Sequence, residues 1–280
     1  MNRQIIFNNR FVDAATPVII AANRGLRYGD GCFETMRLTD GKIVLSALHF
    51  ERLFSSLDQL GFKTPPTFNA ATLEKQAAEL ARKNGMVRFA RVRLAVYRRE
   101  GPPGGGSGEE PDVIIETESL DDAAMQFNNK GLRLGIFRDG RKAADLFSAI
   151  KRNSYYPYLQ AARFAKAQGL DDVVVLNCSG NIADTSVANI FIVSSGIIKT
   201  PALSEGCIAG VMRRHMIDCC RKAGIPVEET VITAEMLENA NEVFLTNAIR
   251  GLRWVAQIDQ AGYSHQVSDM LYKRFVQELS

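Results

Sequence analysis

The chain has 280 residues, of which 46% are hydrophobic and 23% are charged, and its net charge is +3. This length exceeds the roughly 100–200 residues of an ordinary domain, so we expect two domains. The composition is typical of a globular enzyme, and the small net charge argues against nucleic acid as a partner. No apolar run approaches the roughly 18 residues that cross a bilayer, and no signal-like segment follows Met1, so we expect no membrane partner and a cytoplasmic location.

The cysteines and histidines do not suggest a metal site. Five cysteines are scattered without a CxxC pair, and the three histidines are isolated from one another. A zinc site needs closely spaced ligands of these types, so we expect no metal. Scattered thiols in a chain of this length also fit a reducing compartment.

The first half of the chain predicts a mixture of strands and helices. A strand from Cys32 to Leu38 precedes a helix from Ser46 to Gly61, whose apolar residues recur at helical spacing and which carries Arg52. A second helix is expected over about Ala70 to Lys83. Arg88 to Arg98 then alternates as a strand with one apolar face.

Two segments of the first half interrupt this pattern. Gly101 to Pro111 is rich in glycine and proline, and we interpret it as a mobile loop inside the first domain. The hydrophobic pattern then breaks between Asp121 and Asn129. We therefore predict an N-terminal α/β domain over 1–120, a linker over 121–129 and a C-terminal α/β domain over 130–280.

The second half opens with a strand from Leu132 to Ile136. A polar loop from Arg138 to Asp145 is expected to follow and to lead to Lys151. The next segment, Tyr156 to Gln168, predicts a helix with Leu159 on its apolar face.

Lys151 and Asp184 are the first candidates for chemistry. Lys151 lies in an apolar and aromatic setting that favours a nucleophilic amine, and Asp184 follows beyond a helix and a strand. Together they could hold an aldehyde cofactor at one end and its ring nitrogen at the other. A solvated lysine and an Asx turn at Asp184 are the alternatives.

A phosphate site is suggested near Gly206 to Arg214. Small residues lead there into a helix, where free backbone N–H groups and the helix dipole favour an anion. No Gly-Lys-Ser/Thr follows, so the segment is not a nucleotide P-loop. Arg52 could supply a charged partner, although alone it is also compatible with a solvated helix face.

Seven blocks of sequence occur in a fitting order. They are Arg27 to Arg37, His49 to Leu53, Lys151, Asn181 to Asp184 with Asn189 to Phe191, Thr200-Pro201, Gly206 to Arg213 and Glu242 to Ala248. This order resembles the class IV aminotransferases, the fold-type IV pyridoxal-phosphate enzymes, over about residues 5 to 258. The resemblance implies a two-domain α/β (α+β) fold similar to D-amino acid aminotransferase, with pyridoxal 5'-phosphate in the interdomain cleft. It also implies a small-molecule amino substrate and a homodimer.

The resemblance assigns roles to individual residues. Lys151 would be the catalytic Schiff-base lysine, Arg52 a phosphate ligand, and the amides of Val211 and Met212 the phosphate cradle. Asp184 would meet the pyridine nitrogen. The family usually has glutamate there, so the carboxylate of this chain is one methylene shorter.

Two further cofactor contacts follow from the resemblance. Tyr156 matches a tyrosine that branched-chain aminotransferases place on the cofactor's phenolic oxygen, with Tyr155 as a rival for this role. Ala248 stands where those enzymes have a phosphate-binding threonine, so Thr246 or Asn247 would substitute for it.

The substrate contacts and the reaction are less closely defined. Tyr28, Arg98 and Arg99 are candidates for the substrate carboxylates, and both arginines are equally compatible with strand-end surface charges. The blocks look most like 4-amino-4-deoxychorismate lyase, which releases 4-aminobenzoate and pyruvate and supplies a folate precursor. An amino acid aminotransferase acting on branched-chain or D-amino acids with a 2-oxo acid acceptor is the alternative. A pyridoxal-phosphate-binding protein with little turnover is a third possibility.

Overall fold

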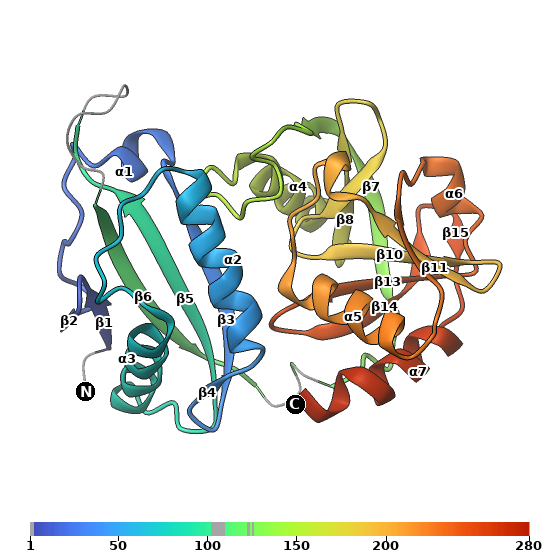
Figure 1. Ribbon diagram of the computed structural model, residues 1–280. Coiled ribbons are helices and arrows are strands. Elements are labelled where there is room, and N and C mark those ends of the chain that lie inside the picture. The colour runs from blue at the N-terminus through green and yellow to red at the C-terminus, as the bar shows by residue number, and fades with distance from the viewer. Residues whose placement is uncertain (1–2, 102–109, 122–123, 125, 280) are drawn as a thin grey trace. The chain divides into compact units, whose positions relative to one another are not determined.

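Figure 1 shows the computed structural model, which describes residues 3–101, 110–121, 124 and 126–279. The chain divides into two compact units. Unit 1 comprises Met1–Ala124 with Lys151–Tyr155, and unit 2 comprises Met125–Ile150 with Tyr156–Ser280. The division after Ala124 falls within the segment 121–129, which the sequence suggested as a linker and of which three residues lie outside the described part. Residues 102–109 of the expected loop also lie outside it.

Unit 1 contains one antiparallel sheet with helices packed on it. The strand order is β2-β1-β6-β5-β3-β4, and Figure 1 shows α2 and α3 on one face of the sheet. The elements are β1 (Gln4–Phe7), β2 (Arg10–Asp13), α1 (Arg24–Tyr28), β3 (Gly31–Thr39), β4 (Lys42–Ile43), α2 (Ser46–Gln59), α3 (Ala70–Lys83), β5 (Phe89–Arg98) and β6 (Pro111–Ser119). The two helices and the strand predicted from periodicity are confirmed.

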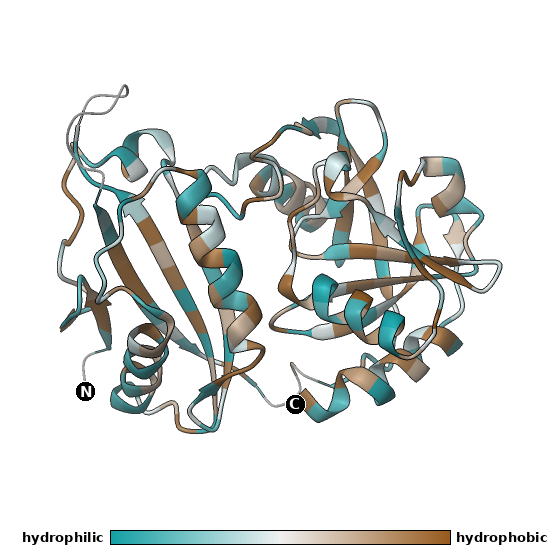
Figure 2. Cartoon of the chain, in the orientation of Figure 1, coloured by the Kyte–Doolittle hydropathy of each residue, from teal (hydrophilic) through white to brown (hydrophobic). Residues whose placement is uncertain are grey.

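The core of unit 1 forms between α2, α3 and the apolar face of β5. Val92 and Leu94 are fully buried on this face, and Leu73 and Leu80 of α3 are at most 1% exposed. Because side chains alternate along a strand, the opposite face of β5 carries Arg93, which is half-buried. Figure 2 shows hydrophobic and hydrophilic residues interspersed along the strands and helices.

The short segment Lys151–Tyr155 belongs to unit 1 because it pairs with the edge of β3. The amide of Phe33 donates to the carbonyl of Lys151, and the amide of Asn153 donates to the carbonyl of Gly31, both at 3.0 Å. The Asn153 side chain donates to the carbonyl of Val96 at 3.0 Å. The sequence placed Lys151 in the second domain, whereas these hydrogen bonds hold it on the sheet of the first unit.

Unit 2 contains a nine-stranded mixed sheet with the order β12-β11-β10-β13-β14-β7-β8-β9, and β15 pairs with β14. The sheet curls, since β9 also contacts β10 and β11. The elements are β7 (Leu132–Lys142), α4 (Tyr156–Ala167), β8 (Asp172–Asn177), β9 (Ile182–Thr185), β10 (Asn189–Ser194), β11 (Ile197–Pro201), α5 (Val211–Lys222), β12 (Val227–Thr230), α6 (Ala234–Glu238), β13 (Glu242–Asn247), β14 (Gly251–Ile258), β15 (Ala261–Gly262) and α7 (Gln266–Phe275).

The two faces of this sheet have different contents. One face carries an aliphatic cluster, here called the core cluster, which includes Val174, Ile190, Ile192, Val243, Leu245 and Val255. On the other face Phe191 stacks on Phe244, with ring centroids 4.8 Å apart. The separation follows from the alternation of side chains along β10 and β13.

Two local predictions in unit 2 were wrong. The expected loop from Arg138 to Asp145 is strand as far as Lys142, because β7 resumes its pairing with β8 after an irregularity between Phe137 and Arg141. Leu159 was placed on the buried face of α4, but its side chain is 55% exposed and Tyr158 is buried instead. The tyrosine ring replaces an aliphatic side chain in the core because its hydroxyl finds a buried partner.

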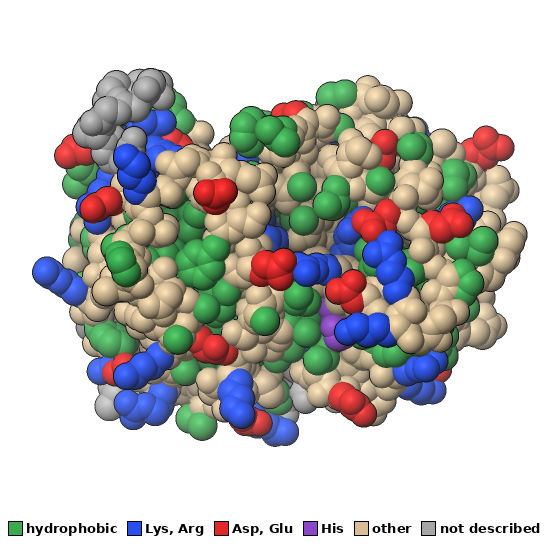
Figure 3. Space-filling view, viewed as in Figure 1, with side chains coloured by type: hydrophobic (Ala, Val, Ile, Leu, Met, Phe, Trp, Pro, Cys, Tyr) green, Lys and Arg blue, Asp and Glu red, His purple; other side chains and the backbone are tan. Residues whose placement is uncertain are grey.

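None of the described helices has the length and apolarity that crossing a membrane requires. Figure 3 shows Lys and Arg side chains mixed with Asp and Glu side chains on the face in view. This mixture agrees with the nearly balanced charge of the chain.

We predict that Phe191→Ala lowers the free energy of unfolding by about 3–5 kcal/mol, because the ring is fully buried and its removal leaves a cavity beside Phe244. Leu159→Ala serves as the control, since that side chain is mostly exposed and its loss should cost well under ~1 kcal/mol. Urea unfolding followed by circular dichroism measures both. Equal losses in the two variants would contradict the assignment of the core.

Candidate active site

Lys151 lies on unit 1 between two aromatic rings. Its Nζ is 4.5 Å from the ring centroid of Phe33 and 5.1 Å from that of Tyr155. The two rings meet edge to face at 5.5 Å, so the lysine is held on an aromatic surface at the edge of β3. Aromatic faces attract an ammonium group and orient it. Unlike a carboxylate, they do not neutralise its charge.

Tyr155, and not Tyr156, is therefore the aromatic neighbour of Lys151 within unit 1. Tyr156 begins α4 in unit 2, and 68% of its side chain is exposed. This placement supports Tyr155 as the alternative candidate for the contact with the cofactor's phenolic oxygen. For Tyr156, only its position in the sequence motif still supports a contact with the cofactor's phenolic oxygen.

Arg52 is fixed by a buried carboxylate on the sheet of unit 1. Its Nε donates to Glu34 Oε1 at 2.7 Å, and a second guanidinium nitrogen donates to Oε2. His49 contacts the same carboxylate at 2.7 Å through Nδ1. Glu34 and His49 are 2% and 1% exposed. This arrangement orients the arginine, which the sequence predicted as a phosphate ligand.

The charge state of Glu34 follows from these partners. Burial alone would raise the pKa of its carboxyl group, but Arg52 and His49 outweigh burial and lower the pKa to about 2. The carboxylate is therefore ionised at every ordinary pH, and it neutralises the arginine that it holds.

Asp184 is a buried carboxylate of unit 2, and a β-bulge sets its direction. In β9, Asp184 pairs with Val175 whereas Ile182 pairs with Leu176, so Ala183 is the extra residue of the bulge. Without the bulge, Asp184 and Ile182 would share one face of the strand. Ile182 lies in the core cluster, and Asp184 is turned away from it.

Three hydrogen-bond donors and one ammonium group surround this carboxylate. Oδ2 accepts from the hydroxyl of Tyr158 at 2.7 Å and from the amide of Ile208 at 2.8 Å. Oδ1 accepts from the side-chain amide of Asn189 at 2.8 Å. The Nζ of Lys142 lies 3.5 Å from Oδ2 and also contacts the Tyr158 hydroxyl. Burial raises the pKa of Asp184, and Lys142 with these three donors opposes that shift.

Sequence reasoning missed Lys142 and Tyr158. Lys142 was placed in a loop, and Tyr158 was one residue away from the face assigned to α4. A signal was present for Tyr158, because positions 158, 161 and 165 recur at helical spacing and the last two are alanines. No local signal links Lys142 to Asp184, since their contact depends on the pairing of β7 with β8.

The start of α5 offers free amide groups for an anion. Gly210 is the N-cap residue and forms no side-chain cap, so the amides of Val211 and Met212 at the first turn receive no capping side chain. A Cβ atom at position 210 would lie 1.8 Å from Asn189 Oδ1. Glycine is thus required where the helix start approaches the residue that holds Asp184.

Thr246 adds a polar group on the same face of the sheet. It pairs directly with Asn189 across β10 and β13, so both side chains point to that face. The residue is 1% exposed, and its hydroxyl oxygen has no hydrogen-bond partner among the described residues. A buried hydroxyl without a partner is uncommon and marks a place for a polar ligand.

Asn247 has a different role from Thr246. Its Oδ1 accepts from the amides of Ile249 at 3.1 Å and Arg250 at 2.7 Å. Its Nδ2 donates to the carbonyl of Val187 at 3.4 Å. The side chain therefore stabilises the turn that joins β13 to β14. Of the two residues that the sequence offered as a phosphate ligand, Thr246 is better placed to serve.

The three residues suggested for substrate carboxylates differ in availability. Arg98 is 8% exposed, and its guanidinium contacts Asp30 and the carbonyls of Leu60 and Gly61. Arg99 pairs with Asp112 at 2.9 Å and keeps 40% of its side chain exposed. Tyr28 is 56% exposed at the end of α1. Arg98 is thus buried and engaged within the protein. Arg99, although paired with both Asp112 and Glu110, and Tyr28 stay partly exposed.

The described residues contain no group of three or more His, Cys, Asp and Glu side chains that could hold a metal ion. The polar groups instead suit an organic anion. Unit 1 supplies an oriented lysine and arginine. Unit 2 supplies a buried carboxylate, an uncapped helix start and an unpartnered hydroxyl.

Comparison with known proteins finds similarity to the class IV aminotransferases. The family model for amino-transferase class IV matches residues 31–258. An aminodeoxychorismate lyase of Vibrio harveyi is 27% identical, with 84% of this chain and 86% of that protein covered. A D-alanine aminotransferase of Bacillus licheniformis is 24% identical, with 91% and 88% covered. The crystal structure of a branched-chain aminotransferase from Thermoproteus uzoniensis with norvaline superposes with a TM-score of 0.88 at 25% identity, covering 100% of this chain and 95% of that one.

We predict that Glu34→Gln costs about 3–5 kcal/mol at neutral pH, because it leaves Arg52, whose side chain is only 12% exposed, without its counter-charge. The folded-state pKa of about 2 lies below the ordinary value of 4.5. Glu34 therefore contributes stability that is fully present above about pH 4.5 and is lost as the pH falls through about 2. The variant should lose this part of the pH dependence.

Thermal or urea unfolding between pH 2 and 7 measures the difference. Glu118→Gln is the matched control, since that carboxylate pairs with Arg91 but its side chain is 53% exposed. Parallel pH profiles for wild type and Glu34→Gln would contradict the role of Glu34.

Proposed function

This chain belongs to the class IV aminotransferases, and we propose that it acts as a 4-amino-4-deoxychorismate lyase, which forms 4-aminobenzoate and pyruvate. The family and the mixed α/β fold expected from the sequence motifs are confirmed. The cofactor of the family is pyridoxal 5'-phosphate, as the motifs also predicted. The particular reaction, the role of each residue, a homodimer and a cytoplasmic location are parts of the proposal.

The residues of unit 2 fit this cofactor. The unpartnered hydroxyl of Thr246 and the uncapped start of α5 suit a phosphate, and both lie with Asn189 on one face of the sheet. Oδ1 of Asp184 accepts a single hydrogen bond from the described residues, so it retains capacity for a protonated ring nitrogen. We assign the phosphate to Thr246, the amides of Val211 and Met212, and Arg52.

The chemistry can be derived from the residues of this chain. When bound, the cofactor supplies an electron sink for the carbon that carries the substrate amine. Lys151 would hold the cofactor through Nζ, and its amine, once released, would take the proton from that carbon. Asp184 would hold a proton on the ring nitrogen, and Lys142 and Tyr158 keep its carboxylate in place. Tyr28 and Arg99 are the accessible candidates for the substrate carboxylates.

The placement of Tyr155 beside Lys151 carries the choice of the lyase. The motif blocks favour the lyase, and Tyr156 was the one residue that favoured branched-chain aminotransferases. Because the ring beside the lysine belongs to Tyr155, the argument from Tyr156 is weakened. The known relatives do not separate the two reactions, because a lyase at 27% identity and a branched-chain aminotransferase at 28% identity match the chain about equally well.

An aminotransferase is the second candidate. It is supported by the D-alanine aminotransferase and by the branched-chain aminotransferase structure, which cover nearly the same part of the chain. The two reactions share the removal of a proton from the amine-bearing carbon. They differ in whether the substrate then expels pyruvate and becomes aromatic.

One experiment separates these functions. The purified protein with bound cofactor is incubated with aminodeoxychorismate, and separately with leucine or D-alanine plus 2-oxoglutarate. We expect equal amounts of 4-aminobenzoate and pyruvate from the first mixture, and no product from Lys151→Ala, which should also lose the visible absorbance band of the attached cofactor. Glutamate without 4-aminobenzoate would overturn the lyase. Cofactor binding without either product would indicate a binding protein.

We predict that Thr246→Val weakens binding of pyridoxal phosphate by about 10- to 150-fold, because a hydrogen bond to a charged group contributes roughly 1.5–3 kcal/mol. The cofactor-free protein should lose no stability, since the hydroxyl has no partner there. Thr200→Val is the matched control. Its buried hydroxyl donates to the carbonyl of Ile190 at 2.8 Å, so its loss should lower stability by ~1 kcal/mol and leave cofactor affinity unchanged. Unchanged affinity in Thr246→Val would remove this residue from the phosphate site.

A further inference from the structure

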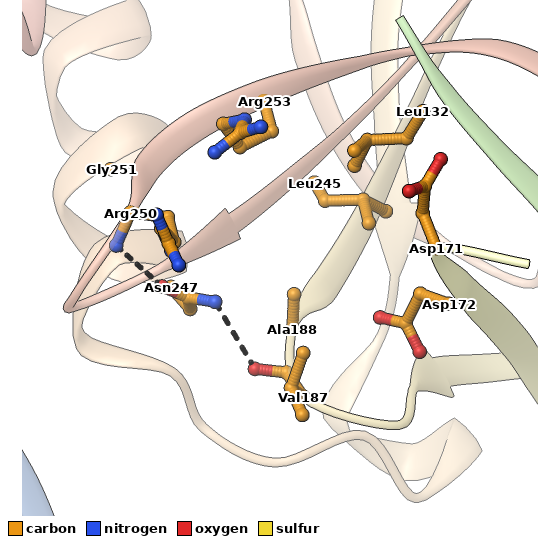
Figure 4. Close-up of a pocket in the computed structure, with 10 residues that line it drawn as sticks. All are labelled: Leu132, Asp171, Asp172, Val187, Ala188, Leu245, Asn247, Arg250, Gly251 and Arg253. Atoms are coloured by element: carbon orange, nitrogen blue, oxygen red, sulfur yellow. Dashed lines mark hydrogen bonds between the residues drawn. The ribbon is translucent and has the colours of Figure 1, made fainter. Parts of the chain in front are cut away.

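Unit 2 contains a cavity of about 320 Å³ on the face of the sheet that carries the core cluster. Leu245 and Arg253 pair directly across β13 and β14, and both line this cavity, which Figure 4 shows. Thr246, the next residue, points to the opposite face. The cavity is therefore separated by the sheet from Thr246 and Asn189, and it is a different site from the one assigned to the cofactor.

One side of the cavity is formed by Arg250 and Arg253, here called the arginine side. Neither guanidinium group forms an ion pair or a hydrogen bond with a described residue, and the buried Nε of Arg253 has no partner. Burial, followed by the charge of Arg250, lowers the pKa of Arg253. Two neighbouring arginines without bound carboxylates form a receptor for an anionic group.

The other side is formed by Asp171 and Asp172, here called the aspartate side. Asp172 is 4% exposed, and its Oδ1 accepts from the Val173 amide and from the Ser186 amide and hydroxyl. Its Oδ2 has no hydrogen-bond partner among the described residues. Figure 4 shows both carboxylates across the cavity from the two guanidinium groups. A cationic group would be stabilised there.

We propose that this cavity binds a free α-amino acid with an aliphatic side chain, whose carboxylate contacts the arginine side and whose ammonium group faces the aspartate side. Leu132, Leu245 and Ala188 provide apolar surface for the side chain. The volume lies at the lower end of the roughly 300–1,000 Å³ that small-molecule sites occupy, which fits a ligand of leucine size.

The separated charges distinguish this ligand from simpler ones. A ligand with only a carboxylate would be attracted by the arginine side and repelled by the aspartate side. A ligand with only an amine would be attracted by the aspartate side and repelled by the arginine side. A zwitterion gains from both sides at once. The site requires neither the lyase nor the aminotransferase reaction, so its test is independent of the proposed function.

Calorimetric titration of the complete protein tests the proposal. The cofactor is first fixed to the protein by borohydride, so that leucine cannot react. The probes are L-leucine, 4-methylpentanoate, which lacks the amine, and 3-methylbutylamine, which lacks the carboxylate. We expect one equivalent of leucine to bind at least about tenfold more tightly than either single-charge probe.

Variants identify the site. Arg250→Ala and Arg253→Met should each weaken leucine binding at least about tenfold, and Asp171→Asn should weaken leucine but not 4-methylpentanoate. Arg138→Ala is the control, because that side chain is 65% exposed and lies outside the cavity lining. Arg250 is exposed, so its variant remains informative if Arg253→Met does not fold.

Three results would overturn the proposal. They are the absence of leucine binding to the wild-type protein, leucine binding that both arginine variants leave unchanged, and binding of 4-methylpentanoate as tight as that of leucine. The last result would identify a simple anion site.

Discussion

The buried carboxylate of Asp184 is the constraint on which the polar side of unit 2 depends. A carboxylate removed from water is costly unless donors and a counter-charge surround it. Tyr158, Asn189 and the Ile208 amide supply the donors, and Lys142 supplies the charge. Four separate segments of the chain are thereby tied to one side chain. Removal of any of them would leave part of the carboxylate unsatisfied.

The geometry of the neighbouring backbone follows from the same requirement. The bulge at Ala183 turns Asp184 away from the core cluster, and Gly210 lets the start of α5 approach Asn189 without a collision. The uncapped amides of α5 and the hydroxyl of Thr246 then lie on the face that already holds a carboxylate. An anion and a protonated ring nitrogen can be accommodated there together. A single buried charge thus brings the proposed cofactor contacts of unit 2 to one place.

How much could be predicted from the sequence depends on the range of the interactions. The helix of Arg52 and the strand Arg88 to Arg98 follow from local periodicity, and the family follows from the order of short motifs. Tyr158 and Lys142 were missed because strand pairing and helix packing bring them to Asp184. Lys151 was assigned to the wrong unit for the same reason. Its segment is short enough to pair with the edge of β3, and nothing local to residues 151–155 reveals that partner.

Charged side chains are arranged differently on the two faces of the sheet of unit 2. On the face of Asp184, opposite charges lie close together, so their fields cancel and the side chains are fixed. Around the cavity on the other face, arginines and aspartates stand apart, and neither guanidinium group forms an ion pair or a hydrogen bond with a described residue. Three hydrogen bonds to one oxygen of Asp172 hold that carboxylate rigid and leave its other oxygen without a partner. Separated opposite charges keep a field across the cavity, and a ligand with its own opposite charges is stabilised most by that field.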